Sequence, residues 1–475
     1  MRSVRIGGGL GFYGDSYAPA LELVLSGNVQ YVAFDHLAEL TLAILQKDRA
    51  REPALGFAKD LIPLMRAILP QAKEHGVRLI SNAGGLNPLA AARAVAAVCH
   101  ERSLDVSIGV VIGDDVADEL GEVCFDPAPG GRESLAAPAF ASAYLGGLPV
   151  KRALAMGADV VVTGRVADSA LFLGALAHGL DWILPGERPE EDMDWDLLAA
   201  GAVAGHLLEC SGQVVGGNHS ADWTKVPGLD RIGYPIAEVD AAGSLEISKV
   251  AGSGGWLNFD TVREQLLYEV HDPARYHTPD VTVDLTAVEI RPRDSERVRV
   301  EGVRGQAPPK TYKVVAGVKD GYLGQGLIGY SWPHAVEKAR AAERILRQQA
   351  AARGLPLDDV AAEYLGLNSL HGPLAAPGDS DEMNEVYLRM AIRTRERAQA
   401  EAFGRLFPPL ALSGPPTASG FIGIDPVREL FLGRIGSVPR ALVDARVRAF
   451  VRPAAAFFAG TDAGRQMEGR GEDAL

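Results

Sequence analysis

The chain has 475 residues, too many for one ordinary hydrophobic core, and this length predicts at least two domains. Its formal net charge of −14 disfavours nucleic acid or an anionic membrane as a partner, since either would need a basic face. The three cysteines lie far apart without a C-x-x-C pair, so we expect a reducing, cytoplasmic compartment. The N-terminus lacks the apolar run of a signal peptide, and no stretch of roughly 18 apolar residues predicts a membrane span.

The first half of the chain alternates short β-branched runs with amphipathic runs rich in Ala and Leu. Strands are expected at residues 3–8, 30–34, 77–81, 105–112 and 159–163. Helices are expected at residues 17–26, 37–46, 57–75, 88–102, 149–156, 168–178 and 195–210. This alternation predicts an α/β fold with an N-terminal open parallel sheet and crossover helices, Rossmann-like in character.

After Gly212, glycine, proline and alternating apolar residues become frequent, which indicates antiparallel or mixed strands. We therefore expect an α/β domain over residues 1–215, a smaller α+β domain over 216–459 and a flexible tail over 460–475. Within the second domain, strands are expected at 244–250, 298–303, 313–318 and 326–330, and helices at 333–353 and 382–403.

A polar turn follows each of the five expected strands in the first half. These turns cover residues 9–15, 35–36, 82–87, 113–115 and 163–168. In an open parallel sheet, ligands bind outside the carboxyl ends of the strands, where turn amides and helix N-termini converge. We expect the working surface of the protein to form there.

The first turn fits a dinucleotide fingerprint, because Gly9, Gly11 and Gly14 match G-x-G-x-x-G and Asp35 follows about 20 residues later. Against this hypothesis, Asp15 at the start of the helix would repel a bound pyrophosphate. Two other interpretations stay open. Asp15 could cap the helix behind a tight turn, or it could contact a substrate or a metal.

The third turn contains Asn82, Gly84 and Gly85. Helix capping explains the neighbouring Asn87 and Pro88 but not these three residues. A backbone that closely approaches an anion or a carbonyl group would explain them.

The turn after the last expected strand places Arg165 at the start of a helix, where a buried arginine needs a partner. The partner is either a carboxylate or phosphate of a ligand, or an internal acid: Asp168, Asp114 or Asp115. The pair Asp114 and Asp115 could also bind a divalent cation, although helix capping is the simpler interpretation.

His206, Glu209 and Cys210 share one helix face through i, i+3 and i+4 spacing. A titratable trio beside a glycine-rich loop is a candidate for acid–base or nucleophilic catalysis. No zinc spacing completes the trio, and we predict no metal site.

Several motifs together resemble the AtuA family, named for acyclic terpene utilisation. They are residues 11–15, 31–42, 82–88, 157–170, 206–213, 264–273 and 406–420, and the likeness runs from about residue 3 to residue 455. The resemblance implies a role in the catabolism of citronellol- or geraniol-type compounds and branched acids, beside acyl-CoA enzymes. It implies no settled reaction, cofactor or catalytic residue. Some relatives carry an additional ferredoxin-like domain that this sequence lacks, so a separate small ferredoxin-like protein is one expected partner.

Our leading hypothesis is an enzyme that binds a carboxylate or an acyl-CoA and catalyses a hydration, lyase or isomerisation step. The expected substrate contacts are Asn82, Gly84, Gly85, Arg165, Asp168 and Asp35, and the catalytic candidates are His206, Glu209, Cys210 and Asp15. The alternatives are an oxidoreductase dependent on NAD(P) or FAD and a non-catalytic subunit of an acyl-CoA-processing complex. A homo-oligomer is expected, because the apolar loops near 321–332 and 406–420 need a surface to pack on.

Overall fold

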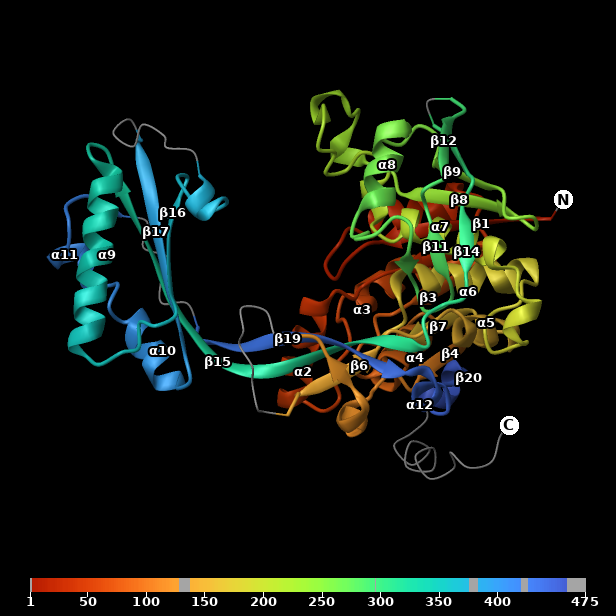
Figure 1. The fold of residues 1–475 in the computed structure, drawn as a ribbon, viewed down its shortest axis with the longest axis horizontal. Coiled ribbons are helices and arrows are strands. Elements are labelled where there is room, and N and C mark those ends of the chain that lie inside the picture. Colours follow the sequence, from red (N-terminus) through yellow and green to blue (C-terminus); the bar gives the residue numbers. More distant parts are fainter. Residues whose placement is uncertain (1, 128–136, 295, 376–382, 420–425, 459–475) are drawn as a thin grey trace. The chain divides into compact units, whose positions relative to one another are not determined.

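The computed structural model describes residues 2–127, 137–294, 296–375, 383–419 and 426–458 (Figure 1). The chain divides into two compact units. Unit 1 comprises Met1–Gly131, Pro138–Gly317 and Gly433–Leu475, and unit 2 comprises Arg132–Ala137 and Val318–Leu432. The boundary expected near residue 215 therefore lies inside unit 1, and the tail expected over 460–475 lies outside the described residues.

Five parallel strands form the centre of the main sheet of unit 1. In spatial order they are β1 (Ser3–Leu10), β2 (Tyr31–Phe34), β3 (Arg78–Ser81), β7 (Val160–Thr163) and β4 (Ser107–Ile112). These bounds lie close to the predicted ones. Every residue of β2 and β7 is buried, as is typical of strands covered on both faces.

Antiparallel strands extend this sheet on both sides, so the sheet as a whole is mixed rather than parallel. Beyond β1 lie β8 (Pro235–Asp240), β9 (Leu245–Lys249), β13 (Val298–Glu301) and β12 (Glu289–Pro292), and beyond β4 lies β20 (Arg448–Pro453). The mixed α/β class is confirmed. The strands expected at 244–250 and 298–303 exist as β9 and β13. They extend the main sheet of unit 1, because β8 pairs with the open edge of β1 and β9 pairs in turn with β8.

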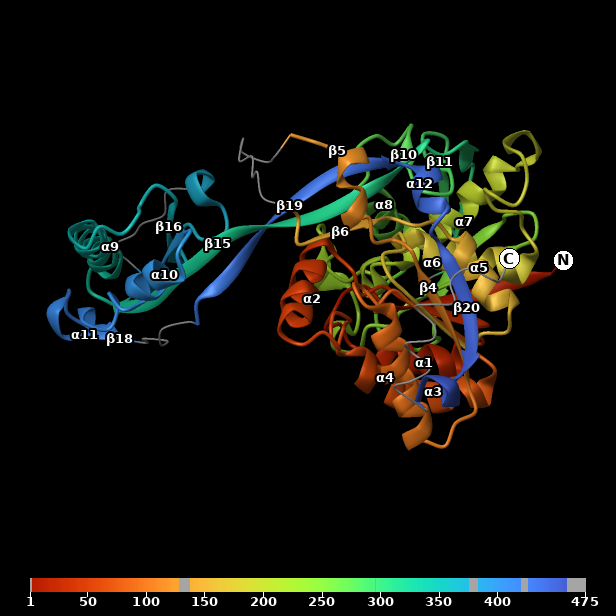
Figure 2. The same cartoon turned by 90° about the horizontal axis from the view of Figure 1, so that it is seen from below.

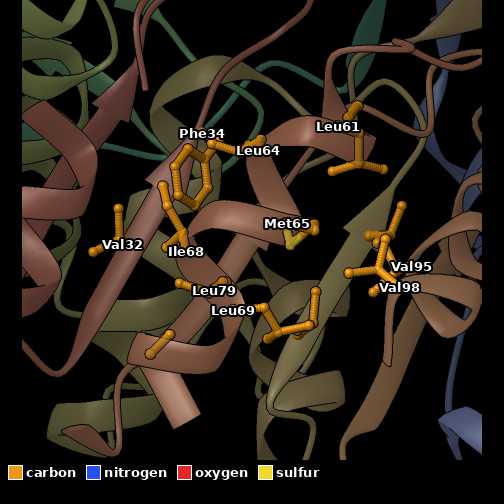
Figure 3. Packing of buried hydrophobic residues seen from close by; sticks show 14 of the residues in the cluster. Val32, Phe34, Leu61, Leu64, Met65, Ile68, Leu69, Leu79, Val95 and Val98 are labelled. Atoms are coloured by element: carbon orange, nitrogen blue, oxygen red, sulfur yellow. The ribbon is translucent and has the colours of Figure 1, made fainter. Parts of the chain in front are cut away.

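Helices cover both faces of this sheet. One group is α1 (Ala18–Ser26), α3 (Leu61–His75) and α4 (Pro88–Glu101), which contact one another in sequence order (Figure 2). The other group is α5 (Leu148–Ala155), α6 (Asp168–Leu180) and α7 (Trp195–Leu208). Alternation along β2 separates the groups, since Val32 and Phe34 pack among side chains of α3 and α4 (Figure 3), whereas Tyr31 bonds His178 of α6.

None of the described helices is long and apolar enough to cross a membrane. Unit 1 also contains further elements. They include α2 (Glu39–Arg51), β5 (Cys124–Phe125), β6 (Phe140–Ala143), α8 (Phe259–Leu267), β10 (Tyr276–His277), β11 (Thr282–Asp284), β14 (Arg304–Gln306), α12 (Arg440–Asp444) and α13 (Ala454–Phe458).

Glycines in β1 and the turn after it allow the end of α7 to approach closely. A Cβ atom at Gly8 would lie 2.4 Å from the carbonyl oxygen of Leu208, and one at Gly11 would lie 2.9 Å from the Cα atom of Cys210. Both obstacles are backbone atoms, which cannot swing aside as the tip of a side chain can. The close approach brings the residues after α7 next to the first turn.

Gly8→Ala should therefore lower the free energy of unfolding by roughly 1–3 kcal/mol, the usual range for overpacking. Gly433→Ala is the matched control, because a Cβ atom at this strand position meets no atom within 4 Å. Urea unfolding measures both variants. Equal stabilities of the two variants would contradict the packing role of Gly8.

In unit 2, helices pack on one face of an antiparallel sheet. The strands are β15 (Thr311–Ser331), β17 (Glu385–Thr394) and β16 (Val360–Leu365), with α9 (Ala335–Ala352) alongside β17 in Figure 1. The other elements are α10 (Arg397–Gly404), α11 (Leu410–Ser413), β18 (Ala418–Ser419) and the first part of β19 (Arg428–Pro439), which continues into unit 1 and pairs there with β5. The two strands expected at 313–318 and 326–330 are one strand, β15, which begins in unit 1, where it pairs with β6.

The helix predicted over 382–403 is wrong, because its first half is the strand β17. Val386, Leu388, Met390 and Ile392 are buried at every second position, which is the period of a strand. The intervening arginines form ion pairs, as Arg393 does with Asp320 at 2.8 Å. The abundance of Arg, Glu and Ala in this segment favoured a helix, but tertiary packing selects the two-residue period.

Candidate active site

A cleft of about 790 Å³ opens in unit 1, lined by residues that follow the carboxyl ends of β1, β2 and β7. Phe12 comes from the first turn, Leu37 from the second and Arg165 from the turn after β7, while Ser211 follows α7. Three tyrosines, Tyr144, Tyr234 and Tyr268, add ring surface. A cleft of this volume, lined by both apolar and ionisable side chains, has room for a small organic molecule.

The structure brings six of the ten predicted site residues together in this cleft. They are Asp15, Asp35, Arg165, Asp168, Glu209 and Cys210. The other four, Asn82, Gly84, Gly85 and His206, do not line it. Each of the four contributes in another way.

Asn82 is fully buried and holds Asp35 in place. Its Nδ2 donates to Oδ1 of Asp35 at 2.5 Å, and its Oδ1 accepts from the backbone N–H of His36 at 2.7 Å. Burial raises the pKa of Asp35 well above its usual range, and the nearby charge of Asp168 raises it further. The protonated form of Asp35 is therefore favoured far more than in an exposed aspartate.

Gly84 and Gly85 fit the third turn between its neighbours. A Cβ atom at Gly84 would lie 2.4 Å from the carbonyl oxygen of Thr163. Gly85 has a φ of 49°, and a Cβ atom there would lie 2.2 Å from a methyl group of Leu45. Internal packing explains both glycines without a ligand.

Arg165 has an internal partner. It is 2% exposed, and its guanidinium lies 2.9 Å from Oδ1 of Asp168, donates to the carbonyl of Leu37 at 2.6 Å and covers the ring of Tyr144 at 3.9 Å. Burial alone would lower the pKa of Arg165, but Asp168 and its neighbours raise it above its ordinary value. Of the acids that the sequence leaves open, Asp168 is the one whose carboxylate contacts the guanidinium of Arg165.

The side chain of Asp114 holds the same turn by a hydrogen bond to the backbone of Arg165. Its Oδ2 accepts from the backbone N–H of Arg165 at 2.9 Å, and burial raises the pKa of Asp114 to about 6. Asp115 instead accepts from the backbone N–H of Ala117 at 2.9 Å, as a turn-capping residue does. In the described part of the chain, no group of three or more His, Cys, Asp or Glu is arranged to hold a metal ion.

Asp114→Asn should flatten the pH dependence of stability. Since the folded-state pKa lies near 6 instead of 3.8, the folded protein binds more protons in between, and stability falls as pH rises through this window. Between about pH 4.5 and pH 7 the loss for Asp114 is about 2 kcal/mol, since its folded-state pKa lies about 1.5 pH units above the lower end of this range. Urea unfolding at about pH 4.5 and pH 7 measures it, with the exposed Asp115→Asn as control. If the free energy of unfolding changes equally with pH in both variants, the raised pKa of Asp114 is contradicted.

His206 and Glu209 form a buried pair at the end of α7. Nδ1 of His206 lies 3.0 Å from Oε1 of Glu209 and 3.4 Å from the hydroxyl of Tyr276. Burial raises the pKa of Glu209 to about 7, although His206 opposes the shift. Burial lowers the pKa of His206, but Glu209 outweighs it, and the net direction is upward. The pair therefore holds a proton that it can exchange near neutral pH.

Cys210 and Asp15 line the cleft in states that do not suit catalysis. Burial, assisted by the charge of Glu209, raises the pKa of the Cys210 thiol, which therefore stays protonated at neutral pH and is a poor nucleophile. Asp15 accepts four hydrogen bonds, from the hydroxyls of Ser211 and Tyr234 and from the backbone N–H groups of residues 11 and 16. Asp15 thus fastens the first turn to neighbouring segments.

The glycines of the dinucleotide fingerprint also serve packing. Gly9 lies within β1, where a Cβ atom would come within 2.4 Å of the ring of Phe34. Gly11 faces the backbone after α7, and α1 begins only at Ala18. In a dinucleotide site, the last glycine opens the helix whose N-terminus binds the pyrophosphate. Here a further turn separates Gly14 from that helix.

Among the cleft residues to which no sequence pattern points are Tyr144, Glu39 and Lys313. The hydroxyl of Tyr144 donates to Glu39 at 2.9 Å, and Nζ of Lys313 lies 3.1 Å from the same carboxylate. Burial would raise the pKa of Glu39, but Lys313 lowers it to about 2. Tyr144 and Lys313 come from segments that pair as β6 and β15, so no local pattern could place them together.

Comparisons with known proteins give one match. No curated protein and no solved structure matches the chain. The model of the acyclic terpene utilisation family protein AtuA matches residues 4–449, nearly the whole chain. This match confirms the resemblance carried by the sequence motifs. The chain belongs to the acyclic terpene utilisation family AtuA.

Proposed function

We propose that this protein is an enzyme of acyclic terpene utilisation that transfers protons in a hydration, dehydration or double-bond isomerisation. The observation that carries the proposal is a pair of buried carboxyl groups, Asp35 and Glu209, in one cleft and both with raised pKa values. Carboxyl groups whose pKa values are raised toward neutral pH commonly act as general acids and bases in enzymes.

The two carboxyl groups have different surroundings, which suits them to different roles. Among the described residues, Asp35 receives side-chain hydrogen bonds at Oδ1, from Asn82 and from the backbone of Leu37, and its protonated form is the general acid. Glu209 lies against His206, which takes up or returns a proton as Glu209 changes charge, and its ionised form is the general base.

A dehydration illustrates the balance of atoms. Asp35 donates its proton to the hydroxyl oxygen of the substrate as the C–O bond breaks. Glu209 removes a proton from the adjacent carbon, whose C–H electrons form the new double bond, and water leaves. Asp35 then regains a proton and Glu209 loses one to solvent, so no oxidant or reductant is consumed. Hydration is the reverse, and isomerisation moves a proton between two carbons with the same groups.

Isotope incorporation tests this proposal. In a strain that needs this gene for growth on acyclic terpenes, compounds that accumulate on its deletion are extracted and incubated with the purified protein in D₂O or H₂¹⁸O. The proposal expects a product that is an isomer of its substrate or differs from it by one water. Hydration incorporates deuterium and ¹⁸O, isomerisation incorporates deuterium, and dehydration releases the hydroxyl oxygen as water. A product that differs from its substrate by two hydrogens, or a hydrated product without either isotope, would overturn it.

A further inference from the structure

The ionisable groups that line the cleft are unbalanced in charge. The acids are Asp15, Glu22, Asp35, Glu39, Asp168, Glu209, Asp230 and Glu269, and the bases are Arg165, Arg231 and Lys313. Acids that are exposed, such as Glu22, Asp230 and Glu269, lie on the solvent side of this lining. An approaching anion meets a field of its own sign.

Two of the three basic groups in this lining pair with acids. Arg165 contacts Asp168 at 2.9 Å, and Lys313 contacts Glu39 at 3.1 Å. The third base, Arg231, donates to the carbonyl of Gly252 at 3.0 Å. To pair with Arg165 or Lys313, a ligand carboxylate would have to displace an internal carboxylate, leaving that acid without a partner.

Two hydrogen-bond donors remain for a ligand oxygen. Burial favours the protonated form of Asp35, which offers an O–H group, and Nε of the charged Arg165 side chain, 2% exposed, has no hydrogen-bond partner among the described residues. The walls beside them include the apolar side chains of Phe12, Leu37 and Ile232. This combination matches a hydroxyl or carbonyl oxygen at the end of a branched hydrocarbon chain.

We infer that the cleft takes an uncharged acyclic terpenoid, an alcohol or carbonyl compound, in preference to a free carboxylate or a CoA thioester. The inference rests on the proposed function, because it names the substrate class of the same cleft. The phosphates of CoA would face the exposed acids Glu22, Asp230 and Glu269, and a carboxylate head group would find Arg165 and Lys313 already paired with acids.

Calorimetric titration of the full chain with four probes that share one C10 skeleton tests the inference: geraniol, geranate, geranoyl-CoA and geranoyl-pantetheine. We expect geraniol to bind at least about tenfold more tightly than geranate. The pantetheine thioester, which lacks the phosphates, should bind more tightly than the CoA thioester. Raising the salt concentration from about 0.05 to about 0.5 M should strengthen geranate binding and leave geraniol binding unchanged, because salt screens repulsion between charges.

Tighter binding of geranate or geranoyl-CoA than of geraniol would overturn the inference, and so would the failure of geraniol to bind at its solubility limit. The proposed function is judged separately, by isotope incorporation. If the CoA thioester binds best and isotope still enters the product, the acid–base function stands and only the uncharged substrate class fails.

Discussion

Glu209→Gln is expected to lower the turnover number at least about 100-fold, within the range usual for loss of a general base. Glutamine keeps the size of the side chain and can still bond His206, but it cannot accept a proton from carbon. In the unmodified protein, kcat/KM should rise with pH through about 7, because burial raises the pKa of Glu209 to about 7 and the ionised form is the active one. Initial rates across pH measure both effects.

Glu264→Gln is the matched control for this variant. Glu264 also forms a carboxylate–histidine pair, with Nδ1 of His219 at 2.7 Å, but it does not line the cleft. Its loss should leave kcat within about twofold of the unmodified value, since only groups at the reacting atoms carry such factors. A folded Glu209→Gln protein with the activity of the Glu264→Gln protein would remove Glu209 from the mechanism.

Asp168→Ala is expected to destabilise unit 1 by roughly 2–4 kcal/mol, because it leaves the charge of Arg165 buried and uncompensated. The estimate lies below the range for a fully buried pair, since the side chain of Asp168 is 27% exposed. Arg165 cannot lose its proton to escape the cost. Urea unfolding followed by circular dichroism measures the change.

The double variant Asp168→Ala/Arg165→Met separates the ion pair from general packing. Methionine fills much of the volume of Arg165 without its charge, so the double variant should recover most of the stability lost in Asp168→Ala. If the double variant is as unstable as the sum of the two single variants, the pair does not act as the structure indicates.

The core of unit 1 could be predicted from the sequence because short local patterns mark its strands and helices. β2 and β7 are short, wholly apolar runs, and α4 begins at Asn87 and Pro88, a cap and a first-turn proline. Since five polar turns follow parallel strands, their gathering at one edge also follows from the topology. Four predicted residues, Asp15, Asp35, Arg165 and Asp168, line the cleft for this reason, and Glu209 and Cys210 reach it from the end of α7.

Pairings between distant segments could not be predicted. The sequence leaves three acids as possible partners of Arg165, and only the folded turn shows that Asp168 contacts its guanidinium. Tyr144 and Lys313 meet because β6 pairs with β15, far along the chain. The segment that forms β17 has residues common in helices, and its two-residue period is decided by packing under α9.

Difference infrared spectroscopy tests the central claim, that two carboxyl groups of the cleft hold protons near neutral pH. The C=O stretch of protonated carboxyl groups is followed from about pH 5.5 to about pH 8.5, well above the ordinary pKa of such groups. The account predicts a band that titrates near pH 7 and vanishes in Glu209→Gln, and a second band at pH 7 that vanishes in Asp35→Asn. Spectra of both variants identical to that of the unmodified protein would show these carboxyl groups already ionised, which contradicts the account.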